Sequence, residues 1–154
     1  MFPSTVHRVP ANTCSAVNAS IRATTRANVA RFQEASPEAI QRRLEELDRE
    51  WDIERRLETN AASIVIAGVA LGVFVDRRWL ALPAVVGGFL LQHAVQGWCP
   101  PLPIMRRFGV RTASEIDHER YALKALRGDF QDIRPPNAGI APVASADALR
   151  AAEL

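Results

Sequence analysis

The residues best suited to chemistry lie near the end of the longest apolar stretch of the chain. Gln92, His93 and Gln96 are polar, and Cys99 follows three residues later. A histidine can transfer a proton or ligate a metal, and a cysteine thiolate is a nucleophile. Because polar groups inside a membrane are costly, a function is a fair default expectation for them.

His93 allows two interpretations. The first is a hydrogen bond between neighbouring helices, made close to the end of the apolar stretch, where water is near. The second is a haem or another metal that two His93 side chains ligate across a dimer axis. We expect the first, because no second ligand residue lies near His93 in the sequence. We therefore predict no metal and no cofactor.

Cys99 also allows two interpretations. It follows the C-terminal end of a predicted helix, which is the negative end and does not lower the pKa of a thiol. The positive charges of Arg106 and Arg107 compensate for the negative helix end only if they lie close to Cys99. We expect an inert interfacial cysteine, and the alternative is a thiol that accepts sulfane sulfur or forms an intermolecular disulfide. Cys14, the other cysteine, is too distant for a CxxC motif.

Composition and motifs exclude several classes of function. The 154 residues include 19 Lys and Arg against 17 Asp and Glu, for a formal net charge of +2, and only 6% are aromatic. Both values argue against a nucleic-acid partner. The sequence has no phosphate loop, HExxH motif or catalytic triad pattern. We expect a protein that is not an enzyme.

Two charge-free stretches predict an antiparallel pair of membrane helices. Residues 59–75 and 79–105 contain no Asp, Glu, Lys or Arg, and only three residues separate them. About 20 apolar residues are needed to cross the bilayer core, so the second stretch spans it comfortably and the first only barely. The sequence therefore predicts a membrane hairpin over residues 59–105.

Interface residues flank these stretches. Arg77 and Arg78, in the turn, must extend toward the headgroups, and Trp79 and Trp98 bracket the second helix at the two headgroup levels. Eight arginines lie near the other membrane edge: Arg42, Arg43, Arg49, Arg55, Arg56, Arg106, Arg107 and Arg111. The positive-inside rule then predicts that both termini are cytoplasmic.

Small residues mark where membrane helices can pack. Gly68 and Gly72 form a GxxxG motif in the first helix, and Ala84 and Gly88 form a similar pair in the second. Small side chains let helix backbones approach closely in lipid. Packing within the hairpin and packing in a homodimer are equally compatible with this pattern.

Residues 36–58 are predicted to form an amphipathic helix that begins at Ser36-Pro37. Its apolar residues recur at spacings of 4, 3 and 4, as in a coiled-coil seam. The seam consists of Ile40, Leu44, Leu47 and Trp51. Since residues 37–58 carry a net charge of −3, a protein helix is a better partner for this seam than an anionic lipid surface.

The remaining segments are a second cytoplasmic helix and two tails. Thr112 and Glu115 form a capping box that begins a helix over residues 112–128. Residues 1–35 contain no apolar core of a secretory signal, and they predict a disordered arm, with an Arg-rich transit peptide as the alternative. Residues 129–154 predict a flexible tail.

The exit of the second membrane helix, Gly97-Trp98-Cys99-Pro100-Pro101-Leu102, resembles the YgaP-like membrane domain family. Gly109-Val110-Arg111-Thr112 and Asn60 add to the resemblance, which covers roughly residues 57–112. It implies an all-helical, self-associating module of the bacterial inner membrane, in some members fused to a rhodanese sulfurtransferase domain. Cys99 matches the family cysteine. The chain departs from the fused members because it has no rhodanese segment.

Together these observations predict an all-α protein. An antiparallel transmembrane hairpin is flanked by two amphipathic cytoplasmic helices and disordered tails. We expect a homodimer in the bacterial inner membrane that acts as an anchor or scaffold, with a cytoplasmic protein partner on residues 37–58. The alternatives are a sulfane-sulfur relay through Cys99 and a soluble four-helix bundle with the hairpin inside it.

Overall fold

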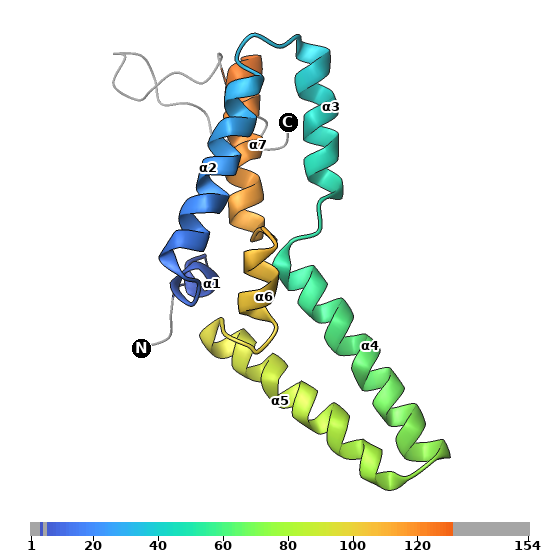
Figure 1. Ribbon diagram of the computed structural model, residues 1–154. Helices are drawn as coiled ribbons and strands as arrows, with labels where there is room; N and C mark the ends of the chain where they lie inside the picture. Colours follow the sequence, from blue (N-terminus) through green and yellow to red (C-terminus); the bar gives the residue numbers. More distant parts are fainter. Residues whose placement is uncertain (1–3, 5, 131–154) are drawn as a thin grey trace, which may run out of the picture. The chain divides into compact units, whose positions relative to one another are not determined.

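The computed structural model describes Ser4 and residues 6–130, and these residues are all-helical, as predicted, with no strand among them (Figure 1). The helices are, in chain order, α1 (Arg8–Ala11), α2 (Ser15–Arg31), α3 (Pro37–Arg49), α4 (Ile53–Phe74), the 3₁₀ helix η1 (Arg77–Leu80), α5 (Ala81–Gln96), α6 (Leu102–Arg107) and α7 (Ala113–Arg127). The predicted tail lies outside the described residues from position 131 onward.

The chain divides into two compact units, each considered by itself. The first comprises Met1–Thr24 and Glu50–Ile116, and the second comprises Thr25–Arg49 and Asp117–Leu154.

The first unit contains a helical hairpin made of α4, η1 and α5. The two long helices run in opposite directions and meet at η1 (Figure 1). The turn is fixed by Asp76, whose side chain accepts a hydrogen bond of 2.8 Å from the Arg78 amide. Pro83 lies in the first turn of α5, where a helix does not need its amide hydrogen. The predicted pair of apolar helices is therefore present.

By length and composition, α4 and the continuous stretch of η1 and α5 could each span a membrane. One 18-residue window that passes this test lies within Pro37–Phe74 and the other within Arg77–Gln96. Only 17% of the first window and 6% of the second are buried. Large apolar side chains on α4 and α5 are exposed, among them Ile66 at 70% and Leu91 at 67%. The described residues therefore leave most of the apolar surface of these helices uncovered.

The predicted helix over residues 36–58 is wrong in its second half. α3 ends at Arg49 and α4 begins at Ile53, so the chain breaks before the apolar stretch. Asp52 caps α4, since its side chain accepts a hydrogen bond of 2.8 Å from the Arg55 amide. The Ile53 amide donates to the Arg111 carbonyl at 2.9 Å, which a continuous helix could not allow.

The predicted disordered arm over residues 1–35 is also wrong for its described part, Ser4 and residues 6–35. α1 and α2 occupy most of it, and two of its few apolar side chains, Val9 and Ile21, are buried. Polar contacts also hold this segment in place. The Asn18 side chain donates to the Pro10 carbonyl at 2.8 Å and accepts from Arg106 at 2.9 Å. A count of apolar residues misses order that hydrogen bonds provide.

In the second unit the seam of α3 is buried by the chain itself. Ile40, Leu44 and Leu47 are each at most 5% exposed. Arg43, beside the seam, donates to the buried Glu119 of α7 at 2.8 Å. The three side chains of the seam are thus covered by the chain itself. Trp51 does not belong to the seam: it lies beyond α3, is exposed, and stacks under the Arg55 guanidinium at 4.3 Å.

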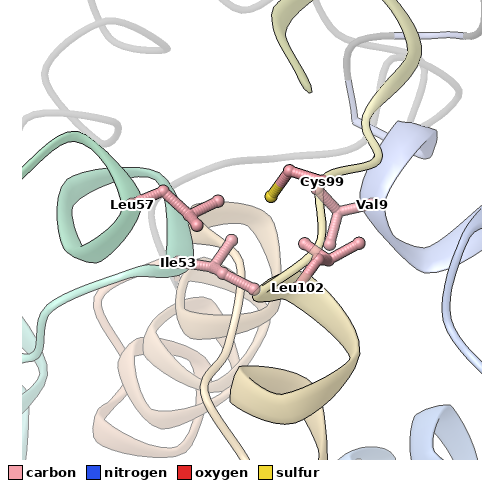
Figure 2. Packing of buried hydrophobic residues seen from close by; sticks show 5 residues of the cluster. All are labelled: Val9, Ile53, Leu57, Cys99 and Leu102. Atoms are coloured by element: carbon pink, nitrogen blue, oxygen red, sulfur yellow. The ribbon is translucent and has the colours of Figure 1, made fainter. Parts of the chain in front are cut away.

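The core of the first unit lies at the base of the hairpin, which is the end away from η1. Val9, Ile53, Leu57, Cys99 and Leu102 form one buried cluster (Figure 2). The cluster joins α1, α4, α6 and the turn before α6. It positions the polar groups described next.

Candidate functional site at the base of the hairpin

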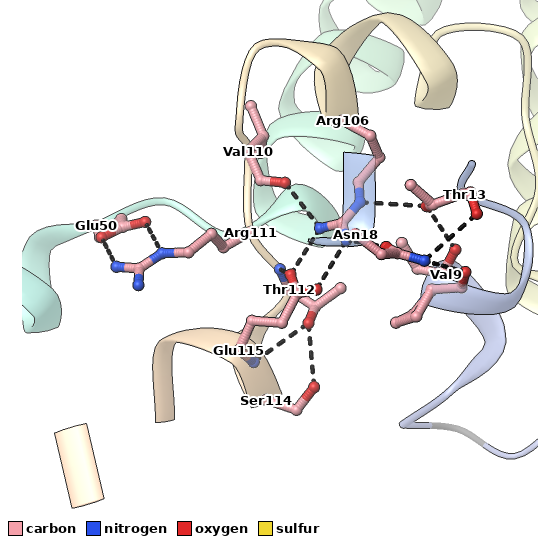
Figure 3. A network of polar contacts seen from close by, with 11 residues as sticks. Val9, Thr13, Asn18, Glu50, Arg106, Val110, Arg111, Thr112, Ser114 and Glu115 are labelled. Atoms are coloured by element: carbon pink, nitrogen blue, oxygen red, sulfur yellow. Dashed lines mark hydrogen bonds and ion pairs between the residues drawn. The ribbon is translucent and has the colours of Figure 1, made fainter. Parts of the chain in front are cut away.

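Arg106 is the centre of a buried polar network in the first unit (Figure 3). Only 1% of the residue is exposed. Its guanidinium donates to both carboxylate oxygens of Glu115 at 2.6 and 2.7 Å, to the Asn18 side chain at 2.9 Å, to the Val110 carbonyl at 3.0 Å and to the Thr13 hydroxyl at 3.2 Å. We call these five residues the arginine network.

Glu115 connects this network to the predicted capping box. Its carboxylate accepts from the Thr112 amide at 2.9 Å, and its own amide donates to the Thr112 hydroxyl at 3.3 Å. Burial acts to raise the pKa of Glu115, but the hydrogen bonds from Arg106 and Thr112 outweigh it and hold the pKa below its ordinary value. The carboxylate is therefore charged and anchors the start of α7.

The lowered pKa of Glu115 predicts a loss of stability in acid. A group whose pKa is depressed by folding stabilises the protein fully above its unfolded pKa, and this contribution is lost as the pH falls through the folded pKa. We expect the melting temperature in detergent, followed by circular dichroism, to fall below about pH 4.5, the ordinary value for this group. Glu115→Gln should be less stable at pH 7 and should lose less stability on acidification. An identical acid slope in both proteins would contradict the assignment.

A second polar cluster crosses the base of the hairpin. The Nε2 atom of His93, in α5, lies 2.6 Å from the Oε2 atom of Glu54, in α4. Arg8 donates to the other oxygen of the same carboxylate at 2.9 Å. His93 is only 4% exposed, whereas the Glu54 side chain is 30% exposed, so the cluster lies at the edge of the buried region. We call Arg8, Glu54 and His93 the histidine cluster.

The histidine cluster explains why α1 lies against the end of α5. Arg8 also donates to the Ala94 carbonyl at 3.1 Å, and Asn12 donates to the Gln96 carbonyl at 2.9 Å, so two orphan carbonyls of the helix end are satisfied. Gly97 ends α5 with a φ of +76°, and a Cβ atom there would lie 2.7 Å from the Arg8 carbonyl oxygen. Only glycine allows this approach.

Cys99 is a buried member of the apolar cluster, and its sulfur points into that cluster (Figure 2). It is 3% exposed, and burial raises the pKa of its thiol, which the Leu102 amide offsets only in part. Arg106 does not compensate, because its guanidinium is occupied by the arginine network, and Arg107 is exposed. A raised pKa and a covered sulfur are the opposite of what a sulfur acceptor needs.

A cavity separates the middle parts of α4 and α5. Its volume is about 440 Å³, and parts of residues 57–64, 86–93 and 99–101 line it. The walls are mostly apolar, and the polar side chains among them are Asn60, Ser63 and His93. Two buried side-chain nitrogens of the described chain have no hydrogen-bond partner: Arg8 Nε and His93 Nδ1.

The predicted packing glycines separate into two groups. Gly68 and Gly72 are buried and pack within the hairpin: a Cβ atom on Gly68 would lie 2.7 Å from Pro83 Cδ, and one on Gly72 would lie 2.5 Å from Leu80 Cδ2. Ala84 and Gly88 are exposed, and nothing lies within 4 Å of a Cβ atom built on Gly88. The GxxxG motif thus packs against the other arm of the hairpin near its tip. No such contact covers Gly88.

Other predicted site residues lie apart from the histidine cluster. Gln96 is exposed and Gln92 is partly buried, so neither shares the burial of His93. Trp79 and Trp98 are 45% and 36% exposed at the two ends of α5. Arg77 and Arg78 form the exposed turn. The described residues hold no group of three or more His, Cys, Asp or Glu that could bind a metal ion.

Sequence reasoning missed Arg8, Glu54 and the role of Arg106. The sequence places Arg8 and Asn18 in a predicted disordered arm. It suggests two roles for Arg106, as an arginine at the membrane edge and as a positive charge beside Cys99, and neither is the centre of a polar network. The capping box was the one available signal, because it fixes the Glu115 carboxylate at a helix start and leaves the second oxygen in need of a donor.

Comparison of the chain with protein-family models, with curated proteins and with solved structures gave no match.

Proposed function

We propose that this chain is an integral protein of the bacterial inner membrane, in which the hairpin anchors a helical cytoplasmic part and acts as a non-catalytic scaffold. One observation carries the proposal: the apolar surface of α4 and α5 is left exposed by the rest of the described chain. Large exposed apolar surfaces mark contact with lipid or with another protein. Their position on two helices of spanning length favours lipid.

The arginines indicate how the hairpin is oriented in the membrane. Arg77 and Arg78 are at the turn, and the eight arginines named above flank the other edge of the hairpin in the sequence. The positive-inside rule then places the turn outside and both chain ends in the cytoplasm. The arginine network supports a rigid anchor, because it ties the segment after the hairpin to α2 and α7.

Self-association is assigned to the open face of α5. Gly68 and Gly72 are occupied within the hairpin, so a homodimer must use other small residues. Ala84 and Gly88 provide a surface on which a second helix could approach closely. We also propose a relationship to the YgaP-like family, supported by the position of residues 97–102 directly after the second hairpin helix.

Thiol labelling tests the membrane topology. Cys14 is exposed and Cys99 is buried, so a reagent that cannot cross the membrane should label Cys14 and spare Cys99 in the folded protein. We expect Cys14 to be labelled in inverted vesicles and protected in spheroplasts. The pattern should reverse for Arg78→Cys in a Cys14→Ser background, because the turn lies on the other side.

The same membranes are extracted with carbonate as a control for integration. The protein should stay in the pellet, as expected for a hairpin embedded in lipid. Release into the supernatant, or labelling of both positions from one side, would contradict the proposal.

A further inference from the structure

A groove lies at the base of the hairpin, where both charge-free stretches of the chain meet the charged segments. Thr59 and Asn60 are the first residues of one stretch, and Met105 is the last residue of the other. These residues line the groove together with Trp51, Arg56, Phe108 and Val110. The volume of about 380 Å³ is within the size range of pockets that hold small ligands. In a membrane-spanning hairpin this is the level of the lipid headgroups.

One part of the groove wall is apolar and open to the surroundings. Trp51 is 40% exposed and Phe108 is 83% exposed. Met105 and Val110 pack against the buried apolar cluster of the first unit, which holds them in place. Such a wall suits the glycerol backbone and the first methylene groups of a lipid, because an inorganic anion gains nothing from apolar contact.

The other part of the groove carries positive charge. Among the described residues that line it, Arg56 is the one charged residue, and its Nε donates to the Trp51 carbonyl at 3.1 Å. This bond uses one of the five N–H donors of the guanidinium. The Cζ atom of Arg55 lies 4.3 Å from the centroid of the Trp51 ring, and the exposed Arg107 directly precedes Phe108. We call Arg55, Arg56 and Arg107 the groove arginines.

The groove arginines differ from the arginines of the polar clusters. Arg8 and Arg106 each pair with a carboxylate, whereas no described residue forms an ion pair with a groove arginine. Of the nearby acids, Glu54 belongs to the histidine cluster and Asp52 caps α4. Glu58 is exposed and does not line the groove. Because a guanidinium fork matches two oxygens of a phosphate, these free donors fit a phosphate group.

We propose that the groove binds the headgroup of an anionic phospholipid, with the phosphate on Arg56 and the glycerol backbone against Met105 and Phe108. The groove arginines favour an anionic headgroup over a zwitterionic one, because each basic residue at a membrane surface adds attraction for negative lipids. A free phosphate would leave the apolar wall in water, so a lipid is the better occupant. The placement at headgroup level rests on the proposed membrane location.

The test follows the fluorescence of Trp51 in the detergent-purified full chain, with Trp79→Phe and Trp98→Phe to remove the other two tryptophans. The probes are dihexanoyl phosphatidylglycerol, dihexanoyl phosphatidylcholine with the same chains, and glycerol phosphate without chains. We expect saturable binding of phosphatidylglycerol and about fivefold or more weaker binding of phosphatidylcholine. Glycerol phosphate should give no saturable change over the same range of concentration.

Variants of the groove assign the binding to this site. Arg56→Gln removes the charge, so the affinity for phosphatidylglycerol should fall about fivefold or more, while Arg56→Lys should retain more affinity than Arg56→Gln. Arg78→Gln makes the same change in the exposed turn at the other end and should bind as the original chain does. Because Arg56 also bonds to the Trp51 carbonyl, Thr59→Glu is a second variant that leaves this bond in place. It adds a negative charge to the lining and should weaken binding of phosphatidylglycerol more than that of phosphatidylcholine.

Three outcomes would overturn the proposal. They are no saturable response to phosphatidylglycerol, equal binding of phosphatidylglycerol and either other probe, and unchanged binding in both Arg56→Gln and Thr59→Glu. The titration is made in detergent and is independent of thiol labelling and carbonate extraction. Failure of the site and failure of the membrane topology can therefore be distinguished.

Discussion

Replacing Arg106 by methionine should cost the first unit about 3–5 kcal/mol of unfolding free energy, the range expected when one partner of a buried ion pair is removed. The guanidinium is 1% exposed and donates to both oxygens of Glu115. Methionine keeps much of the volume but leaves the Glu115 carboxylate, whose side chain is only 18% exposed, without its cation. The Asn18 oxygen and the Val110 carbonyl lose their donors as well.

The neighbouring Arg107→Met is the matched control. Arg107 is exposed, and its replacement should change stability by no more than about 0.5 kcal/mol. The double variant Arg106→Met with Glu115→Leu removes both charges of the pair and should recover part of the loss. Chemical denaturation in detergent measures all three. Equal stability of the Arg106 and Arg107 variants would show that the arginine network does not support the fold.

Replacing Gly68 by isoleucine should separate the two helices of the hairpin. The first added atom would lie 2.7 Å from Pro83 Cδ, which belongs to a rigid ring in a helix. Overpacking of this kind costs about 1–3 kcal/mol or more. Isoleucine is a better helix former than glycine, so helix propensity alone predicts a gain in stability. Overpacking and helix propensity thus predict changes of opposite sign. Thermal denaturation in detergent gives the sign of the change.

Gly88→Ile is the control with the same chemical change. Nothing lies within 4 Å of the added Cβ atom, so the hairpin should keep its stability or gain slightly. If α5 forms the dimer contact, this variant should be monomeric by light scattering in detergent, while the original chain is dimeric. A dimer that persists in Gly88→Ile would refute the assigned face, and a Gly68→Ile variant as stable as the original chain would refute the packing account of Gly68.

The elements that were predictable from the sequence are those with strong local signals. Ser36-Pro37 begins α3, the capping box begins α7, and Gly97 ends α5. Each is specified by residues within one helical turn, so no knowledge of the tertiary structure is needed. The apolar pair α4 and α5 follows from hydropathy in the same way.

The polar clusters could not be predicted, because their members are far apart in the chain. Arg8 and His93 both contact Glu54, and Asn18 contacts Arg106, over separations of 39 to 88 residues. Composition also misled the interpretation of residues 1–35, where few apolar residues suggested disorder. Their order depends on donors and acceptors supplied by α4, α5 and α6.

Contact of the hairpin with lipid is tested most directly by a nitroxide label on Ile66, in a Cys14→Ser, Cys99→Ser background reconstituted into bilayers. Ile66 is 70% exposed on α4, and Leu126, 42% exposed on α7, is the matched apolar control outside the hairpin. The label at Ile66→Cys should collide readily with oxygen and scarcely with a water-soluble nickel chelate, and the label at Leu126→Cys should do the reverse. Equal access of the nickel chelate to both positions would contradict a membrane-spanning hairpin.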